Sequence, residues 1–335
     1  MWWHGKKQKA FEIKKMEKKD LKIVFFGTPE FAVESLKRLV EGGYNVVGVV
    51  TMPDKPAGRG HKMFHSPVKE YAVEKGLKLM QPVKLKDPEF VEELRSLHAD
   101  LQIVIAFRML PEIVWSMPPL GTFNLHASLL PKYRGAAPIN WAVMNGDTET
   151  GVTTFFLKHE IDTGDIIQQQ KMPVGRHDNV ETVYDGLMKM GAGMVIETVD
   201  AIIAGTVHAI PQDKLLTKNE EPTPAPKIFK DTCKIDWNWC GEKIYNHVRG
   251  LSPYPAAWTE ITDQAGNVYT AKIFETGEPE TGVNAVPGAV TADKNRMWIG
   301  CGDGRIEILS LQLAGKKRMD AGAFLRGFDV SGCKC

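Results

Sequence analysis

The sequence predicts an α/β protein in which a doubly wound, mostly parallel sheet is followed by a small C-terminal β-barrel. Three observations predict this. Short apolar runs alternate with helical segments in the first part of the chain, whereas short β-like runs with glycine-rich turns fill the last part. A length of 335 residues also exceeds what one hydrophobic core usually serves, which favours two domains.

The parallel sheet is expected to begin with the apolar run at residues 21–26, which is typical of a strand buried on both faces. A turn then leads into a helix over residues 30–41. Further strands are expected at residues 44–51, 77–80 and 101–107, and further helices at residues 66–75 and 87–98. Ligands of such sheets bind beyond the carboxyl ends of the strands, so we expect the functional site there.

The same pattern continues to residue 204. The sequence predicts a helix at residues 139–144, a strand at 151–158, a turn between two β-like runs at 160–167 and a helix at 180–204. Three small residues in this last helix, Gly191, Ala192 and Gly193, predict close packing on the sheet.

A stiff, extended linker is expected next, because Pro222, Pro224 and Pro226 occupy alternate positions. After a helix at residues 242–249, five short strands are expected at residues 257–261, 268–274, 288–291, 297–300 and 305–313. Five such strands with glycine-rich turns indicate a barrel of the oligonucleotide-binding (OB) kind. Twelve Lys/Arg against thirteen Asp/Glu in residues 231–335 leave only local basic clusters, such as residues 316–318, for nucleic acid.

The chain is therefore expected to divide into an extension at residues 1–20, a first domain at 21–213, a linker at 214–230 and an OB-like domain at 231–335. Eight lysines among the first 22 residues make the extension basic. It lacks the apolar core of a secretory signal and the Arg-rich, acid-poor composition of a transit peptide. A solvated extension is the simpler interpretation, and contact with RNA remains the alternative.

Composition excludes several classes of protein. No stretch is long and apolar enough to span a membrane, and a formal net charge of +1 gives no global electrostatic case for nucleic-acid binding. Five cysteines without a secretory signal or metal-ligand spacing favour reduced thiols in a cytoplasmic protein. Cys333 and Cys335 are expected to lie in a frayed tail.

Candidate chemistry centres on the segment at residues 122–138. Asn124 and His126 alternate with Phe123 and Leu125, so the polar pair is expected on one face of a strand. An amide donor beside an imidazole suits chemistry at a carbonyl, because one group stabilises an oxyanion while the other moves protons. A hydrogen-bonded pair at the edge of the core is the alternative, and these two residues alone leave both open.

Two loops were considered for phosphate. The first turn of the sheet, residues 27–31, lacks the second and third glycines of the dinucleotide fingerprint, so NAD binding is set aside. The Pro- and Gly-rich loop at residues 52–62 is basic and is expected to be exposed. Its Lys55, Arg59 and Lys62 could grip a phosphate backbone, although an ordinary solvated loop would have the same composition.

These motifs together resemble the 10-formyltetrahydrofolate-dependent formyltransferases, and among them the branch that acts on methionyl-tRNA. The resemblance is carried by residues 25–31, 53–60, 124–131, 133–138, 162–165, 251–255 and 315–319 and covers nearly the whole chain after residue 20. The Asn-x-His-x-Ser-Leu-Leu-Pro and Asp-Thr-Gly-Asp elements are shared by the wider family. The basic loop and the C-terminal barrel point to tRNA.

The resemblance implies an enzyme that transfers the formyl group of 10-formyltetrahydrofolate to the α-amino group of methionyl-initiator tRNA for translation initiation. It makes Asn124, His126 and Asp162 the catalytic residues and residues 21–213 the catalytic domain. The amine would attack directly through a tetrahedral intermediate, with Asn124 donating to the oxyanion, His126 moving a proton and Asp162 orienting His126. Neither a metal nor a covalent enzyme intermediate is required.

The resemblance also implies binding sites for both substrates. Folate is expected along Phe107, Arg108, Met109 and Leu110 and along Ser128, Leu129, Leu130 and Pro131. The tRNA is expected to contact Lys55, Arg59 and Lys62, with the barrel cradling its acceptor stem. The family usually has a Tyr-Gly pair where this chain has Phe107 and Arg108, which leaves the geometry of that loop open. No obligatory protein partner is implied, so a monomer is expected.

Two rival functions share part of this pattern. A formyltransferase that acts on a sugar amine or a small nucleotide would use the same three catalytic residues without an RNA loop or a barrel. A non-catalytic tRNA- or folate-binding protein could use the same scaffold.

Overall fold

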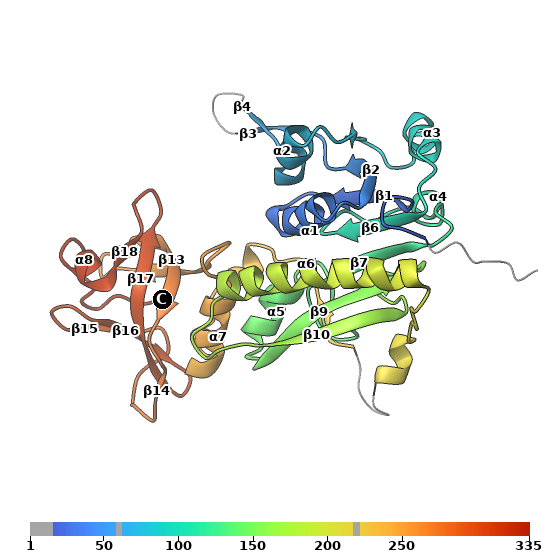
Figure 1. Cartoon of the computed structure of the whole chain (residues 1–335). Helices are drawn as coiled ribbons and strands as arrows, with labels where there is room; N and C mark the ends of the chain where they lie inside the picture. Colours follow the sequence, from blue (N-terminus) through green and yellow to red (C-terminus); the bar gives the residue numbers. More distant parts are fainter. Residues whose placement is uncertain (1–15, 58–61, 217–221) are drawn as a thin grey trace, which may run out of the picture.

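A seven-stranded sheet forms the centre of the first domain in the computed structural model, which describes residues 16–57, 62–216 and 222–335 (Figure 1). Its strand order is β10-β9-β7-β6-β1-β2-β5. The strands are β1 (Lys22–Gly27), β2 (Asn45–Val50), β5 (Leu79–Met80), β6 (Leu101–Ile105), β7 (Thr122–His126), β9 (Glu149–Phe156) and β10 (Ile166–Pro173). Pairing is parallel from β5 to β7 and antiparallel for β9 against both its neighbours, so the predicted mostly parallel sheet is confirmed.

Helices cover both faces of this sheet. They are α1 (Glu30–Glu41), α2 (Pro67–Glu74), α3 (Pro88–Ser96), α4 (Glu112–Trp115), α5 (Pro138–Met144) and α6 (Val180–Ala204). In β1, Ile23 and Phe25 belong to the core beneath α1 and α6, whereas Val24 and Phe26 belong to the core beneath α3 and α4. A continuous apolar run is therefore needed in β1 because each face is buried, as the doubly wound prediction requires.

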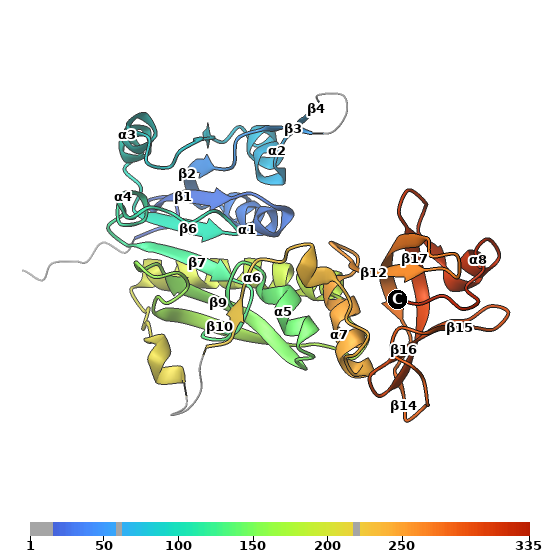
Figure 2. The ribbon, with the colours of Figure 1, turned by 180° about the vertical axis from the view of Figure 1, so that it is seen from behind.

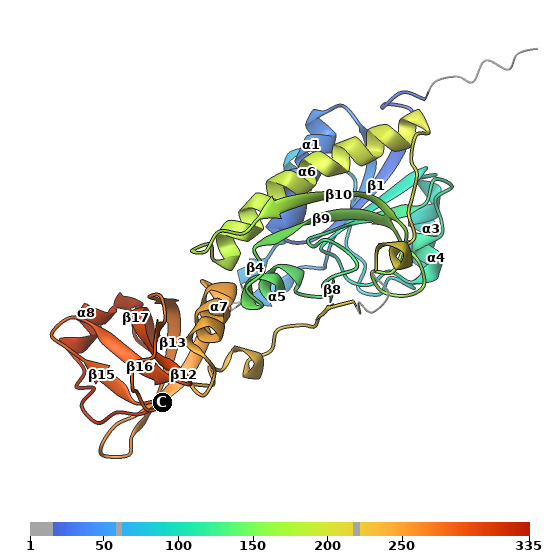
Figure 3. The same ribbon diagram turned by 90° about the horizontal axis from the view of Figure 1, so that it is seen from below.

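Helix α6 crosses the sheet at close range, as Figure 3 shows from below. A Cβ atom on Gly191 would lie 2.7 Å from the side chain of Leu125 in β7. Only a glycine allows the helix to approach this strand so closely, so the predicted packing is confirmed at this position. A Cβ atom on Gly193 would instead lie 3.3 Å from the guanidinium of Arg38 in α1.

The C-terminal domain is a curled antiparallel sheet with the order β12-β13-β17-β16-β15. Its strands are β12 (Ala257–Thr262), β13 (Val268–Thr276), β15 (Val290–Ala292), β16 (Met297–Cys301) and β17 (Gly304–Leu313), and the short β14 (Glu280–Thr281) and β18 (Met319–Asp320) pair with β17. Helices α7 (Gly241–Leu251) and α8 (Ala321–Leu325) accompany them. Alternate residues of β17, such as Ile306 and Ile308, are fully buried, which gives the period of two expected for a strand with one solvated face.

The last residues of the chain are part of this barrel, so the predicted frayed tail is wrong. Lys334 forms antiparallel bridges both to Thr262 at the end of β12 and to Ala289 next to β15. Cys333 is 2% exposed. The tail joins the two edges of the curled sheet, because unpaired edge N–H and C=O groups find their partners there.

The linker packs against the first domain on its way to the second. Strand β11 (Pro224–Ala225) pairs in parallel with β8 (Arg134–Gly135), and the connection also contains two short 3-10 helices at Gln212–Leu215 and Asp231–Cys233. The extended conformation predicted from the alternating prolines is present at residues 224–225.

Helix α7 lies between the two domains, as seen from behind in Figure 2. It packs against α5 on one side and against β12, β13 and β17 on the other. A Cβ atom on Gly250 would lie 2.5 Å from Met144 of α5, and Asn140 donates a 2.8 Å hydrogen bond to the carbonyl of Gly250. None of the helices within the described ranges has the length and hydropathy needed to cross a bilayer.

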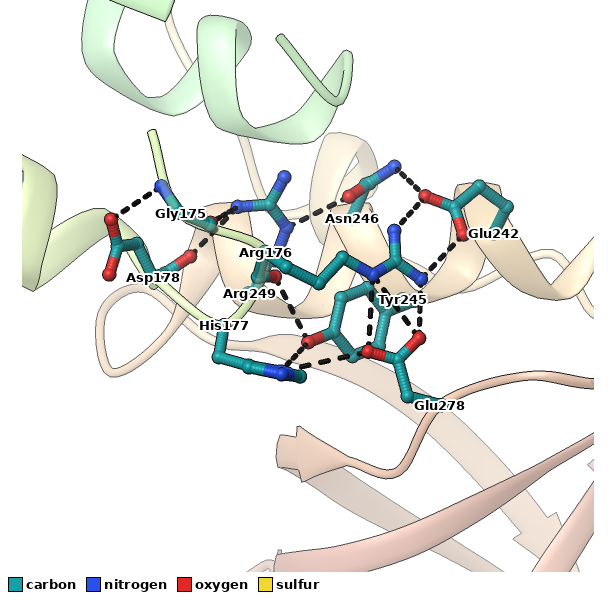
Figure 4. Close-up of polar contacts among 9 residues, drawn as sticks. All are labelled: Gly175, Arg176, His177, Asp178, Glu242, Tyr245, Asn246, Arg249 and Glu278. Carbon is teal, nitrogen blue, oxygen red and sulfur yellow. Dashed lines mark hydrogen bonds and ion pairs between the residues drawn. The ribbon is translucent and has the colours of Figure 1, made fainter. Parts of the chain in front are cut away.

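A polar cluster around Arg176 completes the contact between the domains (Figure 4). Arg176 follows β10 in the first domain, and its guanidinium binds Glu242 of α7 and Glu278 beyond β13. Its Nη2 lies 2.7 Å from Glu242 Oε2 and 2.5 Å from Glu278 Oε2. Arg249 of α7 in turn contacts the first domain, where it donates a 2.8 Å hydrogen bond to the carbonyl of Asp178.

Candidate active site

A cavity of about 830 Å³ opens at the carboxyl ends of β6 and β7. Asn124, His126 and Asp162 all line it, although Asp162 comes from the turn between β9 and β10. The structure therefore brings together the three residues that were singled out as catalytic. Their location matches the rule that doubly wound sheets bind ligands beyond the carboxyl ends of their strands.

Strand β7 divides its side chains between the core and the cavity. Phe123 and Leu125 pack in the core beneath α6, and Asn124 and His126 line the cavity. The expected alternation is thus present. His126 is 7% exposed, so its imidazole is held in a largely dry environment.

The imidazole of His126 is oriented by a backbone group. Its Nε2 atom lies 2.8 Å from the carbonyl oxygen of Tyr133. A carbonyl oxygen can only accept, so Nε2 carries a proton and Nδ1 is the nitrogen that faces the cavity. The ring of Tyr133 is buried, its hydroxyl donates to Asp147 at 2.9 Å, and burial raises the pKa of this phenol well above its ordinary value.

Asp162 is held by the loop that follows β7. Its Oδ2 accepts a 2.9 Å hydrogen bond from the N–H of Gly135 and lies 3.8 Å from His126 Nδ1. The second distance is too long for a hydrogen bond, and the two groups form an ion pair only when the imidazole is protonated. The imidazole of His126 is therefore oriented by the hydrogen bond that it donates to the carbonyl of Tyr133. The resemblance had implied Asp162 for this role.

The sequence did not indicate two further residues that hold Asp162 in place, Gln212 directly and Arg134 through Gln212. Gln212 donates to the carbonyl of Asp162, and Arg134 donates to the side-chain oxygen of Gln212. Arg134 lies in the motif at residues 133–138, but its partner Gln212 is 78 positions away along the chain. Gln212 carries no local signal, because a lone glutamine after a helix is usually exposed.

The first of the two predicted folate segments forms a part of the cavity wall that we call the donor arm. Phe107, Arg108, Met109 and Leu110 all belong to its wall. Arg108, which stands where the family usually has glycine, donates to the carbonyls of Pro82 and Val83, the latter at 2.8 Å. Its side chain thus ties two neighbouring loops together, and burial lowers the pKa of its guanidinium.

The second predicted folate segment is not among the residues that line the cavity. Ser128, Leu129, Leu130 and Pro131 are absent from the lining. Their polar groups already have partners within the protein: Thr153 Oγ1 donates to the carbonyl of Ser128 at 2.6 Å, and Gln169 Nε2 donates to the carbonyl of Leu130 at 2.7 Å. These bonds join the segment to β9 and β10.

Another part of the cavity wall, which we call the second arm, consists mainly of apolar side chains from α1, α5 and α6. Phe31, Ile139 and Val180 contribute to it together with Tyr184. The hydroxyl of Tyr184 accepts a 2.8 Å hydrogen bond from the N–H of Phe31, and the two rings meet edge to face at 5.2 Å.

The basic loop begins and ends in a short hairpin of β3 (Lys55–Ala57) and β4 (Lys62–Phe64). Lys55 is exposed, Arg59 lies outside the described residues, and the side chain of Lys62 is likewise not among those described. Asp54 anchors the base of the hairpin by accepting from Lys69 and from Gln81 Nε2, the latter at 3.0 Å. These bonds hold the pKa of Asp54 well below its usual range.

Among the residues in the described ranges, no three His, Cys, Asp or Glu side chains lie together in a way that could hold a metal ion.

Comparison with known families places both domains. The family model described as formyl transferase matches residues 21–199, and the model described as formyl transferase, C-terminal domain, matches residues 227–329. The methionyl-tRNA formyltransferase of Phocaeicola vulgatus is 64% identical over 318 residues, which cover 94% of this chain and 98% of that protein.

Solved structures share the fold at low sequence identity. WlaRD, a sugar 3N-formyl transferase, matches with a TM-score of 0.63 at 20% identity and covers 89% of this chain and 99% of its own. HypX from Aquifex aeolicus, solved with tetrahydrofolic acid, matches with a TM-score of 0.60 at 21% identity and covers 91% of this chain and 46% of its own.

Proposed function

The chain belongs to the formyl transferase family, and from that premise we propose that it transfers a formyl group from 10-formyltetrahydrofolate to the α-amino group of methionyl-initiator tRNA. This product is the one used to initiate translation. The observation that carries the chemistry is the presence of Asn124, His126 and Asp162 in the wall of one cavity. An amide, an imidazole and a carboxylate around one space suit acyl transfer between two nitrogens.

In the first step, the neutral amine attacks the formyl carbon. A carbon–nitrogen bond forms, and the carbonyl electrons move to the oxygen, which becomes an oxyanion. We assign the donor to this oxyanion to the side-chain amide of Asn124, which lines the cavity. Removing one such donor typically costs about 3 to 4 kcal/mol of transition-state stabilisation.

In the second step, the oxyanion collapses, the carbonyl re-forms and the bond to the folate nitrogen breaks. The amine must lose one proton, and the folate nitrogen must gain one. His126 is placed for this transfer, because in its neutral form Nδ1 has a free lone pair while Nε2 donates its proton to the carbonyl of Tyr133. The carboxylate of Asp162, 3.8 Å from Nδ1, stabilises the imidazolium formed on the way.

The folate donor is assigned to the arm formed by Phe107, Arg108, Met109 and Leu110. Apolar walls with a few polar groups at the rim are typical of sites for flat heterocycles. Ser128, Leu129, Leu130 and Pro131 stay assigned to the folate as a prediction from the sequence, with the carbonyls of Ser128 and Leu130 already accepting hydrogen bonds within the protein.

The aminoacyl end of the tRNA is assigned to the second arm. The apolar side chains of Phe31 and Ile139 suit the flexible thioether of methionine. Lys55, Arg59 and Lys62 are assigned to the RNA backbone, by charge, and the barrel to the acceptor stem. The assignment of Arg59 stays a prediction from the sequence.

The deciding experiment supplies charged initiator tRNA and 10-formyltetrahydrofolate and follows the product by mass. A parallel reaction offers an amino-sugar nucleotide at the same concentration, since a sugar formyltransferase shares the fold. We expect formyl-methionyl-tRNA from the first reaction and none from the second. Preferential formylation of the sugar would establish the rival enzyme, and tight binding of tRNA or folate without turnover would establish a binding protein.

We further propose that the enzyme works in the cytoplasm as a monomer without an obligatory protein partner. The two domains share a continuous contact through α7, and the three catalytic candidates come from one chain. Light scattering after size exclusion should give a mass near 37.3 kDa, and a mass near twice that value would refute the monomer.

A further inference from the structure

Gln212 is an unusually buried polar residue at the edge of the catalytic domain. It begins the 3-10 helix after α6 and is 3% exposed. A side-chain amide at that depth must satisfy both its N–H groups and its oxygen within the protein, because an unpaired buried polar group costs about 1 to 3 kcal/mol.

Both N–H groups of Gln212 hold the turn that carries Asp162. Nε2 donates to the carbonyl of Asp162 and to the carbonyl of Gly164, each at 2.8 Å. Asp162 has a φ of +54°, a left-handed conformation that is uncommon for residues other than glycine, although aspartate tolerates it better than most. A Cβ atom on Gly164 would lie 1.5 Å from the carbonyl oxygen of Phe156, so the turn also has no room to shift toward β9.

The side-chain oxygen of Gln212 is connected, through Arg134 and Gly135, to the carboxylate of Asp162. It accepts from Arg134 Nη2 at 2.7 Å and from Arg134 Nε at 3.1 Å. Arg134 is followed by Gly135, whose N–H donates to Asp162 Oδ2 at 2.9 Å. The bonds form a closed ring in which Asp162 is held by its backbone through Gln212 and by its side chain through Gly135.

From this ring we infer that Gln212 is a positioning residue for the transfer reaction, which sets where the carboxylate of Asp162 stands relative to His126. The inference rests on the proposed function and extends it to a residue outside the cavity wall. The separation of 3.8 Å between Asp162 Oδ2 and His126 Nδ1 leaves the pair sensitive to movement of the turn, because Coulomb energy at short range changes steeply with distance.

Two substitutions separate positioning from simple support of the fold. Gln212→Glu keeps the size of the side chain and an oxygen for Arg134 but removes both donors to the turn. Gln212→Leu removes every polar contact. The matched control is Gln102→Leu, because Gln102 is another fully buried glutamine of the same sheet domain, and its contact with Thr122 lies at the opposite, amino-terminal ends of β6 and β7.

We expect both variants at Gln212 to lower kcat for formylation at least about tenfold, since displacement of a catalytic group by about 1 Å can cost 100-fold. The KM values for tRNA and for the folate donor should stay within about threefold, because neither binding arm is touched. Gln102→Leu should leave kcat unchanged. A glutamine that only supports the fold would give the same result at both positions.

A double-mutant cycle with Asp162→Asn completes the test. If Gln212 acts through Asp162, Gln212→Glu should cost much less kcat in the Asp162→Asn background than in the wild type. Folded Gln212 variants with wild-type kcat, or an undiminished cost in the Asp162→Asn background, overturn the inference while wild-type turnover keeps the proposed function intact. A wild-type protein that does not formylate methionyl-tRNA refutes both.

Discussion

His126 Nε2 and the carbonyl oxygen of Tyr133 lie 2.8 Å apart, and this contact decides which nitrogen of the imidazole meets the substrates. The carbonyl keeps a proton on Nε2, so in the neutral imidazole the opposite nitrogen has the lone pair that can accept a proton from the attacking amine. Because the partner is a backbone group, no side-chain substitution at Tyr133 removes it directly.

Replacing this imidazole should remove the proton-transfer step. We expect His126→Ala to lower kcat at least about a hundredfold, the usual scale for a positioned acid–base group, while the KM values change little. Single-turnover formylation with saturating donor measures it. The exposed His208 provides the control, since His208→Ala should leave the rate unchanged. A His126→Ala variant with wild-type turnover would remove this residue from the mechanism.

The amide of Asn124 should matter to a similar extent for a different reason. Asn124→Ala leaves the developing oxyanion without its assigned donor, and we expect a loss of about a hundredfold or more in kcat. Asn45→Ala serves as the control, because Asn45 hydrogen-bonds Lys19 at the amino-terminal end of β2, away from the cavity. Equal rates for the two variants would show that the oxyanion is stabilised elsewhere.

Arg108 should affect the folate donor alone. Its guanidinium joins the loop at Pro82 and Val83 to the loop that forms the donor arm. Arg108→Ala frees both loops, so we expect the KM for 10-formyltetrahydrofolate to rise about threefold to tenfold, with the KM for tRNA and kcat nearly unchanged, because ordering a loop costs binding energy. Arg95→Ala, at an exposed pair on α3, should change neither constant. A rise in the tRNA KM instead would place Arg108 at the acceptor side.

Gly135→Ala should damage both stability and activity. Gly135 has a φ of +128°, and a Cβ atom there would lie 2.5 Å from the carbonyl oxygen of Ala225. We expect a loss of unfolding free energy of about 2 to 4 kcal/mol from strain and overlap together. Gly205→Ala is the matched control, because Gly205 also has a positive φ, of +66°, but open space around it, so only about 1 kcal/mol is expected. Equal melting temperatures for the two variants would contradict the close contact.

The cluster at Arg176 should make stability depend on pH. Hydrogen bonds from Arg176 lower the pKa of Glu242 and the pKa of Glu278 below the ordinary value of 4.5. Carboxylates with a lowered pKa in the folded state stabilise it above about pH 4.5, and this contribution is lost as the pH falls through their folded-state values. All three side chains are more than a third exposed, so water screens the pairs and the whole contribution is about 1 kcal/mol at pH 7.

Urea unfolding of the wild type and Arg176→Met at pH 7 and at pH 4 tests this. The difference between the two proteins should be largest at pH 7 and should shrink at pH 4. Arg296→Met, which removes an ion pair with the half-buried Glu307 in the C-terminal domain, is the control for the loss of an ion pair elsewhere. A difference that grows on acidification would refute the assignment.

The sequence predicted those features of the molecule that depend on neighbours along the chain. The bounds expected for α1 and α6 agree with the structure, and so does the alternation of side chains along β7. Periodicity and capping act over a few residues, so a single sequence carries them.

Features that join distant segments could not be predicted in this way. Gln212 meets Asp162 across 50 positions, and Arg176 meets Glu278 across 102. Lys334 pairs with Thr262 because the barrel curls, and no local pattern in the tail indicates that. The direction taken by Arg108 likewise depends on a neighbouring loop that precedes it by 25 positions.

The short pairing of Pro224 and Ala225 with Arg134 and Gly135 has a practical consequence for dissecting the enzyme. The carbonyl of Ala225 accepts from the N–H groups of Ala136 and Ala137, on the same loop whose Gly135 holds the carboxylate of Asp162. A polypeptide cut directly after α6 would lose this acceptor, and with it the contact that holds the loop against the linker. An isolated sheet domain should therefore be produced with residues up to 226 included, since Trp141 also donates to the carbonyl of Pro226.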